Sequence, residues 1–293
     1  MKDAARLLTY FALTVLFGAL VAPILFWTAQ SLATRGGLSF LGQYRFESFF
    51  HRALMISALA LLWPLWRWLR IRSWRDLGLT QNRHWLRDLS AGILFAAIPL
   101  LCCGALFVRL HVYTLRETVS WLALGSIFLT AAIVPVIEEV FFRGVILGVL
   151  LRSGSRMMSI LFTSALFSIL HFLKPPEHLT TDVTWSSGFV SIANSFSQFN
   201  EPMLLGAGFT TLFLLGWILA DARIRTQSLW LPIGLHAGWI FANGIFNKVA
   251  RREMLTLPWL GKSVLIGIAP LMVGLLTWAL LRAWLNYAST RKT

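Results

Sequence analysis

Acidic residues are scarce in this sequence: Asp and Glu together number 12 among 293 residues, and all charged residues make up only 13%. Soluble domains carry about 25% charged residues, and disordered chains combine low hydrophobicity with high net charge. Hydrophobic residues reach 57%, which excludes both classes. Lys and Arg number 26, so the formal net charge is +14. In a chain this apolar, the basic excess indicates the loops of a membrane protein and no nucleic-acid partner.

Cysteine and several well-known catalytic signatures are also rare or absent. The two cysteines, Cys102 and Cys103, are adjacent in an apolar run, which is typical of small core residues and not of a disulfide or metal framework. The sequence contains no HExxH zinc signature, no Walker A loop and no GxSxG nucleophile elbow. Any catalytic chemistry must therefore come from another set of residues.

Long uncharged runs dominate what is present. A helix needs about 20 apolar residues to cross the hydrocarbon core of a bilayer, and basic residues at its ends can extend a shorter run. The sequence therefore predicts an all-α, polytopic integral membrane protein with about eight transmembrane helices. The predicted spans are 7–34, 53–66, 89–108, 118–137, 157–173, 203–220, 226–247 and 263–281.

The distribution of basic residues predicts the orientation of these spans. Of the 26 Lys and Arg residues, 16 fall in the two termini and the second, fourth and sixth loops. Cytoplasmic loops collect Lys and Arg, so we expect a multi-pass protein of the cell membrane with both termini in the cytoplasm. Membrane lipid is then an obligatory partner. The longest polar stretch, 174–202, is expected to be a connecting loop or a cap over a cavity.

Ionisable residues inside predicted spans are costly and mark candidate functional positions. Glu138, Glu139 and Arg143 interrupt a nearly continuous apolar stretch. On a helix, Glu139 and Arg143 are four residues apart and face each other, whereas Glu138 points about 100° away. One carboxylate can thus be held by the arginine while the other serves as a general base. The alternative is an interfacial ion pair at a helix end.

Two histidines lie in two further spans. His171 ends one span, and His236 lies in another, with Asn243 seven residues later on nearly the same face. A histidine in a membrane span can tie helices together by a hydrogen bond. Together with Glu138, His171 and His236 can instead bind a divalent metal such as zinc or activate a water without metal.

These motifs resemble the CPBP family (CAAX protease and bacteriocin-processing, or Abi) of intramembrane proteases. The family pattern has a Glu-Glu-x-x-x-Arg helix, a Phe-x-x-x-His helix and a His-x-x-x-Asn or Asp helix. Here the first is Glu138, Glu139 and Arg143, and the second is Phe167 and His171. The third departs from the pattern, because Ile240 stands four residues after His236. Asn243 is a candidate substitute from the next turn.

The resemblance implies an intramembrane endopeptidase acting on a peptide or protein substrate. Glu138 and His171 would activate a water, Arg143 would position Glu139, and His236 would donate to the oxyanion. Both a metalloprotease and a metal-free glutamate mechanism agree with it. The implied regions are an N-terminal one with three spans (1–115), a catalytic core with four (116–250), and a C-terminal span and tail (251–293).

Two other functions are compatible with the same residues. A non-catalytic membrane scaffold or immunity-type protein on the same fold would explain Ile240 in the third motif. A small transporter would also use Glu and His within spans as a proton relay, but the sequence lacks the paired broken helices typical of such carriers.

Overall fold

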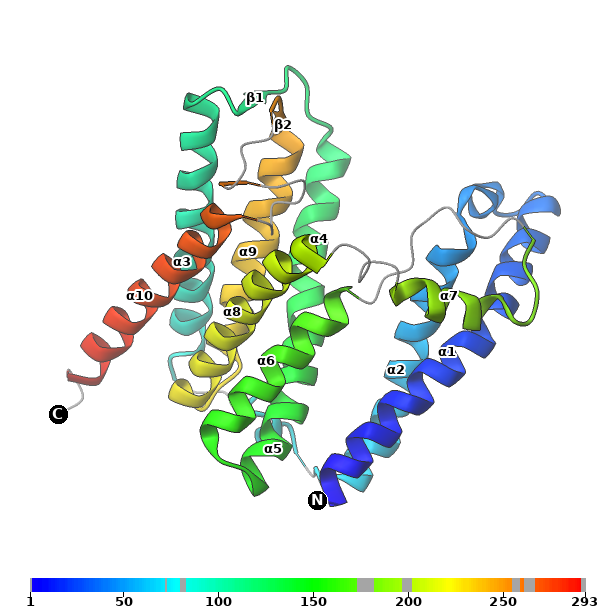
Figure 1. Ribbon diagram of the computed structural model, residues 1–293, viewed down its shortest axis with the longest axis horizontal. Coiled ribbons are helices and arrows are strands. Elements are labelled where there is room, and N and C mark those ends of the chain that lie inside the picture. The colour runs from blue at the N-terminus through cyan, green and yellow to red at the C-terminus, as the bar shows by residue number, and fades with distance from the viewer. Residues whose placement is uncertain are drawn as a thin grey trace. The chain divides into compact units, whose positions relative to one another are not determined.

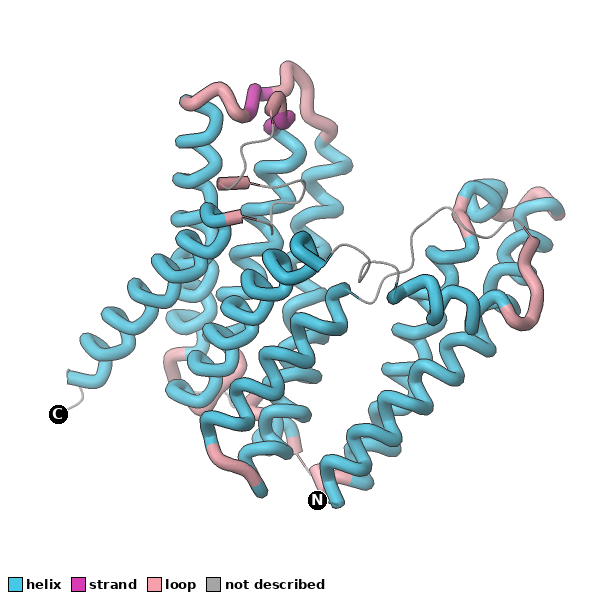
Figure 2. The backbone as a smooth tube through the Cα atoms, in the orientation of Figure 1, coloured by secondary structure: helices cyan, strands magenta, loops and turns pink. Residues whose placement is uncertain are grey.

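The computed structural model describes residues 2–71, 73–79, 83–172, 182–196, 202–254, 259–260 and 267–290. Helices form most of this part of the chain, together with one pair of short strands (Figures 1 and 2). The predicted all-α class is confirmed, and each predicted span overlaps a helix, although residues 173 and 263–266 of the predicted spans lie outside the described part of the chain. These helices are α1 (Lys2–Thr34), α2 (Phe46–Trp68), α3 (Trp85–Arg109), α4 (Trp121–Glu139), α6 (Arg156–Phe172), α8 (Pro202–Thr226), α9 (Trp230–Val249) and α10 (Ile268–Thr290).

Five of these helices are long and apolar enough to cross a membrane: α1, α2, α3, α8 and α10. Helix α6 is apolar but shorter. A bilayer-spanning helix satisfies its own backbone hydrogen bonds, which is why such apolar sequences fold as helices in lipid. The chain is therefore a multi-pass membrane protein. The total of eight spans stays a prediction.

The chain divides into two compact units, and the first comprises residues 1–72 and 169–205. Its helices α1 and α2 pack against each other around a small core that includes Ala19, Phe46 and Phe50. The segment 174–202, expected to be a loop, contains the short helix α7 (Ser187–Ser195), which packs on α1. Residues 174–181 and 197–201 of that segment lie outside the described part of the chain.

The second unit comprises residues 73–168 and 206–293. Helix α9 packs between α3 and α4, and α10 packs on α3. The predicted division into three regions is a different partition, and it stays a prediction. The shorter elements of this unit are η2 (Trp74–Leu77), the π-helix η3 (Val140–Ile146), α5 (Leu147–Ser153), and the strands β1 (Tyr113–Leu115) and β2 (Ala250–Arg252).

Glycines allow α3 and α9 to approach very closely. A Cβ atom built on Gly234 would collide with the backbone carbonyl oxygen of Leu89, and one on Gly238 would lie 2.5 Å from that of Ile93. From the other helix, a Cβ on Gly92 would lie 2.6 Å from the carbonyl oxygen of Leu231. Small residues spaced four apart bring membrane helices into backbone contact. The Gly234 side of α9 is therefore fixed against α3.

The strands β1 and β2 pair antiparallel and join the loop after α3 to the end of α9. Arg252 donates to the hydroxyl oxygen of Tyr113 at 2.7 Å. On the neighbouring residues, the Thr114 hydroxyl and the Arg251 guanidinium both donate to the Glu253 carboxylate, and these bonds hold the pKa of Glu253 below its usual value. The pairing thus ties two distant connections together at one end of the unit.

Candidate active site

The adjacent carboxylates lie where α4 changes its geometry. Glu138 and Glu139 are the last residues of α4, and the chain continues directly into the π-helix η3, which carries Arg143. Short π-helical turns are rare and are frequent at functional sites. The side chains of Glu139 and Arg143 are both fully buried, with 0% exposure. Burial of an acid and a base in an apolar bundle requires that they be paired.

Arg143 is held by groups from three different helices. Its Nη1 donates to Oε1 of Glu139 at 2.9 Å, which confirms the predicted pair four residues apart. Its Nη2 donates to the backbone carbonyl of Gly216 on α8 at 3.3 Å. The guanidinium carbon also lies 4.5 Å from the centre of the Phe167 ring on α6, a distance suited to a cation–π interaction.

His236 completes the group from α9. Its Nδ1 lies 2.8 Å from Oε1 of Glu139, the same oxygen that accepts from Arg143. An ionised carboxylate only accepts hydrogen bonds, so Nδ1 carries the hydrogen. The other ring nitrogen, Nε2, lies 3.9 Å from Oε2 of Glu138. Gly234 packs on α3, and His236 follows it by two residues. The side chain of His236 therefore projects from the opposite side of α9, where it contacts Glu139 of α4.

The two carboxylates have different surroundings. The Glu139 side chain is completely buried, whereas 28% of the Glu138 side chain is exposed. Glu139 is therefore placed to orient His236. The exposed part of Glu138 does not include Oε2, the oxygen that faces His236, because that atom is buried.

The contacts above do not include the other two predicted site residues, His171 and Asn243. His171 lies on α6, four residues after Phe167, and belongs to the first unit because the division runs through α6 after Ser168. Asn243 accepts a hydrogen bond from Asn247 at 3.0 Å and lines an apolar cavity of about 110 Å³ with residues of α3, α8 and α10. The catalytic roles of both residues stay predictions.

The predicted metal ligands do not form a recognisable metal site here. Among the described residues, no group of three or more His, Cys, Asp or Glu side chains is arranged to hold an ion. Glu138 and His236 form a pair, and Nδ1 of His236 is engaged by Glu139. A zinc site needs at least three protein ligands. A metal at these residues stays a prediction from the sequence.

Sequence reasoning missed two contacts of Arg143. The Gly216 carbonyl belongs to α8, and nothing in its local sequence marks it as an acceptor. Phe167 belongs to the second motif, but its position over the guanidinium depends on how α6 packs. Its ring also lies 6.0 Å from the His236 ring in an edge-to-face arrangement. Phe167 thus contacts two members of the polar group at once.

These features define a class: an all-α, multi-pass membrane protein with a carboxylate–arginine–histidine group inside a helix bundle. Residues 119–242 match the family model described as type II CAAX prenyl endopeptidase Rce1-like. The resemblance to the CPBP proteases is thus shown over this segment, which ends one residue before Asn243, and the family is one of proteases. No curated protein and no solved structure gave a match. The matched segment includes Glu138, Glu139, Arg143, Phe167, His171 and His236.

Proposed function

We propose that the chain is an intramembrane endopeptidase in which Glu138 acts as the general base. The observation that carries the proposal is the division of labour between the carboxylates: Glu139 is buried against Arg143 and His236, while Glu138 is partly exposed and 3.9 Å from Nε2 of His236. Two hydrogen bonds of about 2.8 Å can reach from one water to both atoms. The substrate class is a peptide or protein segment within or beside the bilayer.

The proposed reaction is hydrolysis of a peptide bond. Glu138 accepts a proton from the water as the water oxygen attacks the carbonyl carbon, and later returns it to the leaving nitrogen. His171, assigned by its motif, assists in activating that water. His236 donates from Nε2 to the developing oxyanion, and Glu139 keeps its ring in place through Nδ1. Such a donor commonly contributes about 3–4 kcal/mol to the transition state.

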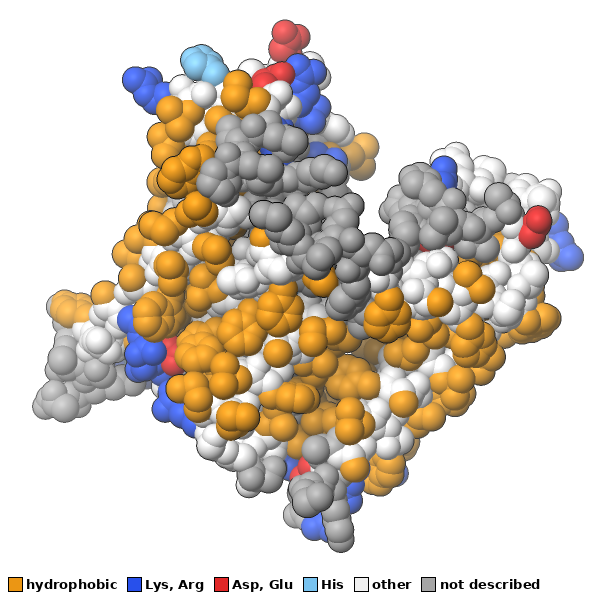
Figure 3. All heavy atoms as spheres, viewed as in Figure 1, with side chains coloured by type: hydrophobic (Ala, Val, Ile, Leu, Met, Phe, Trp, Pro, Cys, Tyr) orange, Lys and Arg blue, Asp and Glu red, His pale blue; other side chains and the backbone are white. Residues whose placement is uncertain are grey.

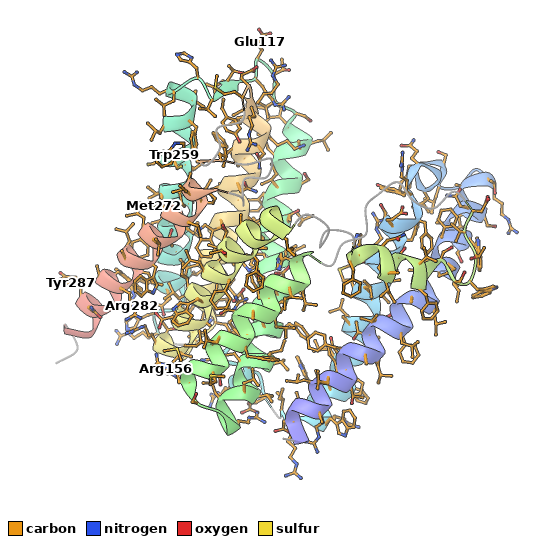
Figure 4. The ribbon with its side chains drawn as sticks, in the orientation of Figure 1. Glu117, Arg156, Trp259, Met272, Arg282 and Tyr287 are labelled. Carbon is orange, nitrogen blue, oxygen red and sulfur yellow. The ribbon has the colours of Figure 1, made fainter. Side chains whose placement is uncertain are left out.

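Substitution of Glu138 tests this proposal. Glu138→Gln retains the shape of the side chain and removes the base, so we expect cleavage to fall about 10²- to 10⁴-fold. His171→Ala should also lose activity. The readout is cleavage of fluorogenic apolar peptides by the full-length protein in detergent micelles. The matched control is Glu117→Gln, an exposed acid in the loop before α4 (Figure 4). Unchanged turnover in Glu138→Gln would refute the assignment.

The second candidate is a non-catalytic membrane scaffold on the same fold. It is favoured by Ile240 in the third motif and by the way Glu139 links α4 to α9 through His236, a tie that a purely structural role would also use. The two functions differ in what Glu138 does. In a scaffold, Glu138→Gln keeps the cellular function of the protein as long as the chain remains folded.

A further inference from the structure

Another buried acid of the same unit, Asp221, lies on α8. The Asp221 side chain is only 5% exposed and is surrounded by three arginines from three helices. Arg225 donates from Nε to both carboxylate oxygens at 3.0 and 3.1 Å. Arg282 of α10 donates from Nε to Oδ2 at 3.0 Å. Arg156, the first residue of α6, has Nη2 at 3.9 Å from Oδ1.

The cluster carries more positive charge than its own acid can balance. Three guanidinium groups face one carboxylate, which leaves two positive charges. Arg225 and Arg282 both donate to Asp221 from Nε. Among the described residues of the cluster, their terminal nitrogens Nη1 and Nη2 therefore make no hydrogen bond. The side chains of Arg156, Arg225 and Arg282 are 55%, 31% and 34% exposed. Guanidinium groups with open terminal nitrogens suit the oxygens of a phosphate.

The cluster also lies where the headgroups of a bilayer are expected. Arg156 begins the apolar helix α6, and Arg225 is in the last turn of the candidate span of α8. Arg282 lies in α10, five residues before the end of its candidate span. Figure 4 labels Arg156 and Arg282, and Figure 3 shows basic side chains at this end bordered by apolar ones. All three arginines come from segments whose basic residues predict a cytoplasmic position.

Apolar surface adjoins the cluster along α10. The Arg282 guanidinium lies 4.9 Å from the ring of Trp278, and Trp and Tyr side chains are enriched at the level of lipid headgroups. Met272, Leu275 and Leu276 are exposed on α10, within about three turns of Arg282. A molecule with a phosphate at the arginines and acyl chains along α10 would contact both surfaces. A free phosphate would use only the first.

We infer that Arg156, Arg225 and Arg282 bind the phosphate headgroup of an anionic phospholipid. Basic pockets between membrane helices bind such headgroups on the cytoplasmic side. The bound phosphate supplies the negative charge that Asp221 alone does not, and it links the ends of α6, α8 and α10. This site is distinct from the carboxylate–histidine group and does not depend on the proposed peptidase activity.

Lipid titration of the purified full-length protein tests the inference. The probes are phosphatidylglycerol and phosphatidylcholine with identical acyl chains, measured by native mass spectrometry and by the thermal midpoint in a neutral detergent. We expect phosphatidylglycerol to bind more tightly and to raise the midpoint. Each of Arg225→Gln and Arg282→Gln should weaken its binding about fivefold, the usual effect of one basic residue near anionic lipid. High salt should weaken it in the native chain.

Two control variants separate headgroup binding from general effects. Arg251→Gln, on β2 and 65% exposed, removes an arginine from outside the cluster and should leave binding unchanged. Arg282→Lys keeps the charge but not the guanidinium nitrogens, so its binding should fall between that of the native chain and that of Arg282→Gln. It remains informative if the Gln variants do not fold. Equal binding of phosphatidylcholine, equal loss in Arg251→Gln, or an equal midpoint shift with inorganic phosphate alone would each overturn the inference.

Discussion

Glu138 and Glu139 are neighbours in the chain, yet their side chains have different environments, and we propose different tasks for them. Glu139 is the buried anion that Arg143 and His236 share, through one oxygen atom. The Glu138 side chain points about 100° away from that of Glu139 around the helix axis, and it is partly exposed. Removing each acid should consequently affect a different property of the protein, stability in one case and reaction rate in the other.

Glu139→Gln should destabilise the fold more than Glu138→Gln. The amide introduced by Glu139→Gln is neutral, so Arg143 would be left as an uncompensated charge in a buried position, a change that costs about 3–5 kcal/mol. Glu138→Gln removes a partly exposed carboxylate and should change the stability by much less. Unfolding of both variants with denaturing detergent measures the difference. Equal midpoints for the two variants would contradict the buried role assigned to Glu139.

The sequence predicted one half of this polar group and not the other. The Glu139–Arg143 pair follows from a spacing of four residues on a helix, so it required no knowledge of the fold. The link from Glu139 to His236 joins residues 97 positions apart. It depends on how closely α4 and α9 approach each other, and the spacing of residues along the sequence gives no information about that distance. The family resemblance named His236 as a site residue but not its partner.

At the scale of elements, α9 is the helix that fixes the position of His236 in the polar group. One face is fixed on α3 by Gly92, Gly234 and Gly238, and another presents His236 to α4. Because the glycines permit backbone contact, α9 has little freedom to rotate, and the His236 ring is held at a defined position. The chemistry that we propose for Glu138 would thus depend on packing on the far side of α9.

The helices themselves were predictable from hydropathy, whereas two local details were not. Uncharged runs identified the positions of all the long helices, since lipid requires each apolar segment to be helical. The π-helix at Val140–Ile146 differs from an α-helix only in its hydrogen-bond spacing, and no residue type marks that change. Helix α7 was not predicted, because its segment has a polar composition typical of a loop. Its packing on α1 favours the helix.

Gly234→Ala tests the coupling between the glycine contact and the site. The added Cβ would collide with the backbone of Leu89, which cannot move aside as a flexible side chain could. We expect a loss of about 1–3 kcal/mol in stability, typical of overpacking, together with reduced cleavage. The matched control is Gly125→Ala in α4, where a Cβ meets nothing within 4 Å. Removing that helical glycine should be neutral or stabilise by about 0.5–1 kcal/mol.

At the scale of the whole molecule, the charge pattern and the helices determine how the chain is inserted. Five described helices meet the requirements for a span, while α4, α6 and α9, which carry the polar site residues, are not among those five. Polar residues in a span are tolerated when they face the bundle interior, as Glu139, Arg143 and His236 do. We therefore expect these three helices to cross the membrane as well.

The number of spans decides on which side of the membrane each terminus lies. Eight spans place both termini on the same side, predicted to be cytoplasmic, whereas five would place them on opposite sides. A fluorescent protein fused to the C-terminus should therefore fluoresce in the cytoplasm. Alkaline phosphatase, which is active only outside the cytoplasm, should be active when inserted near His111 between α3 and α4 and inactive at the C-terminus. Phosphatase activity both near His111 and at the C-terminus would show an odd number of spans. It would also place Arg282 in the outer leaflet, away from the cytoplasmic leaflet in which the lipid site is expected.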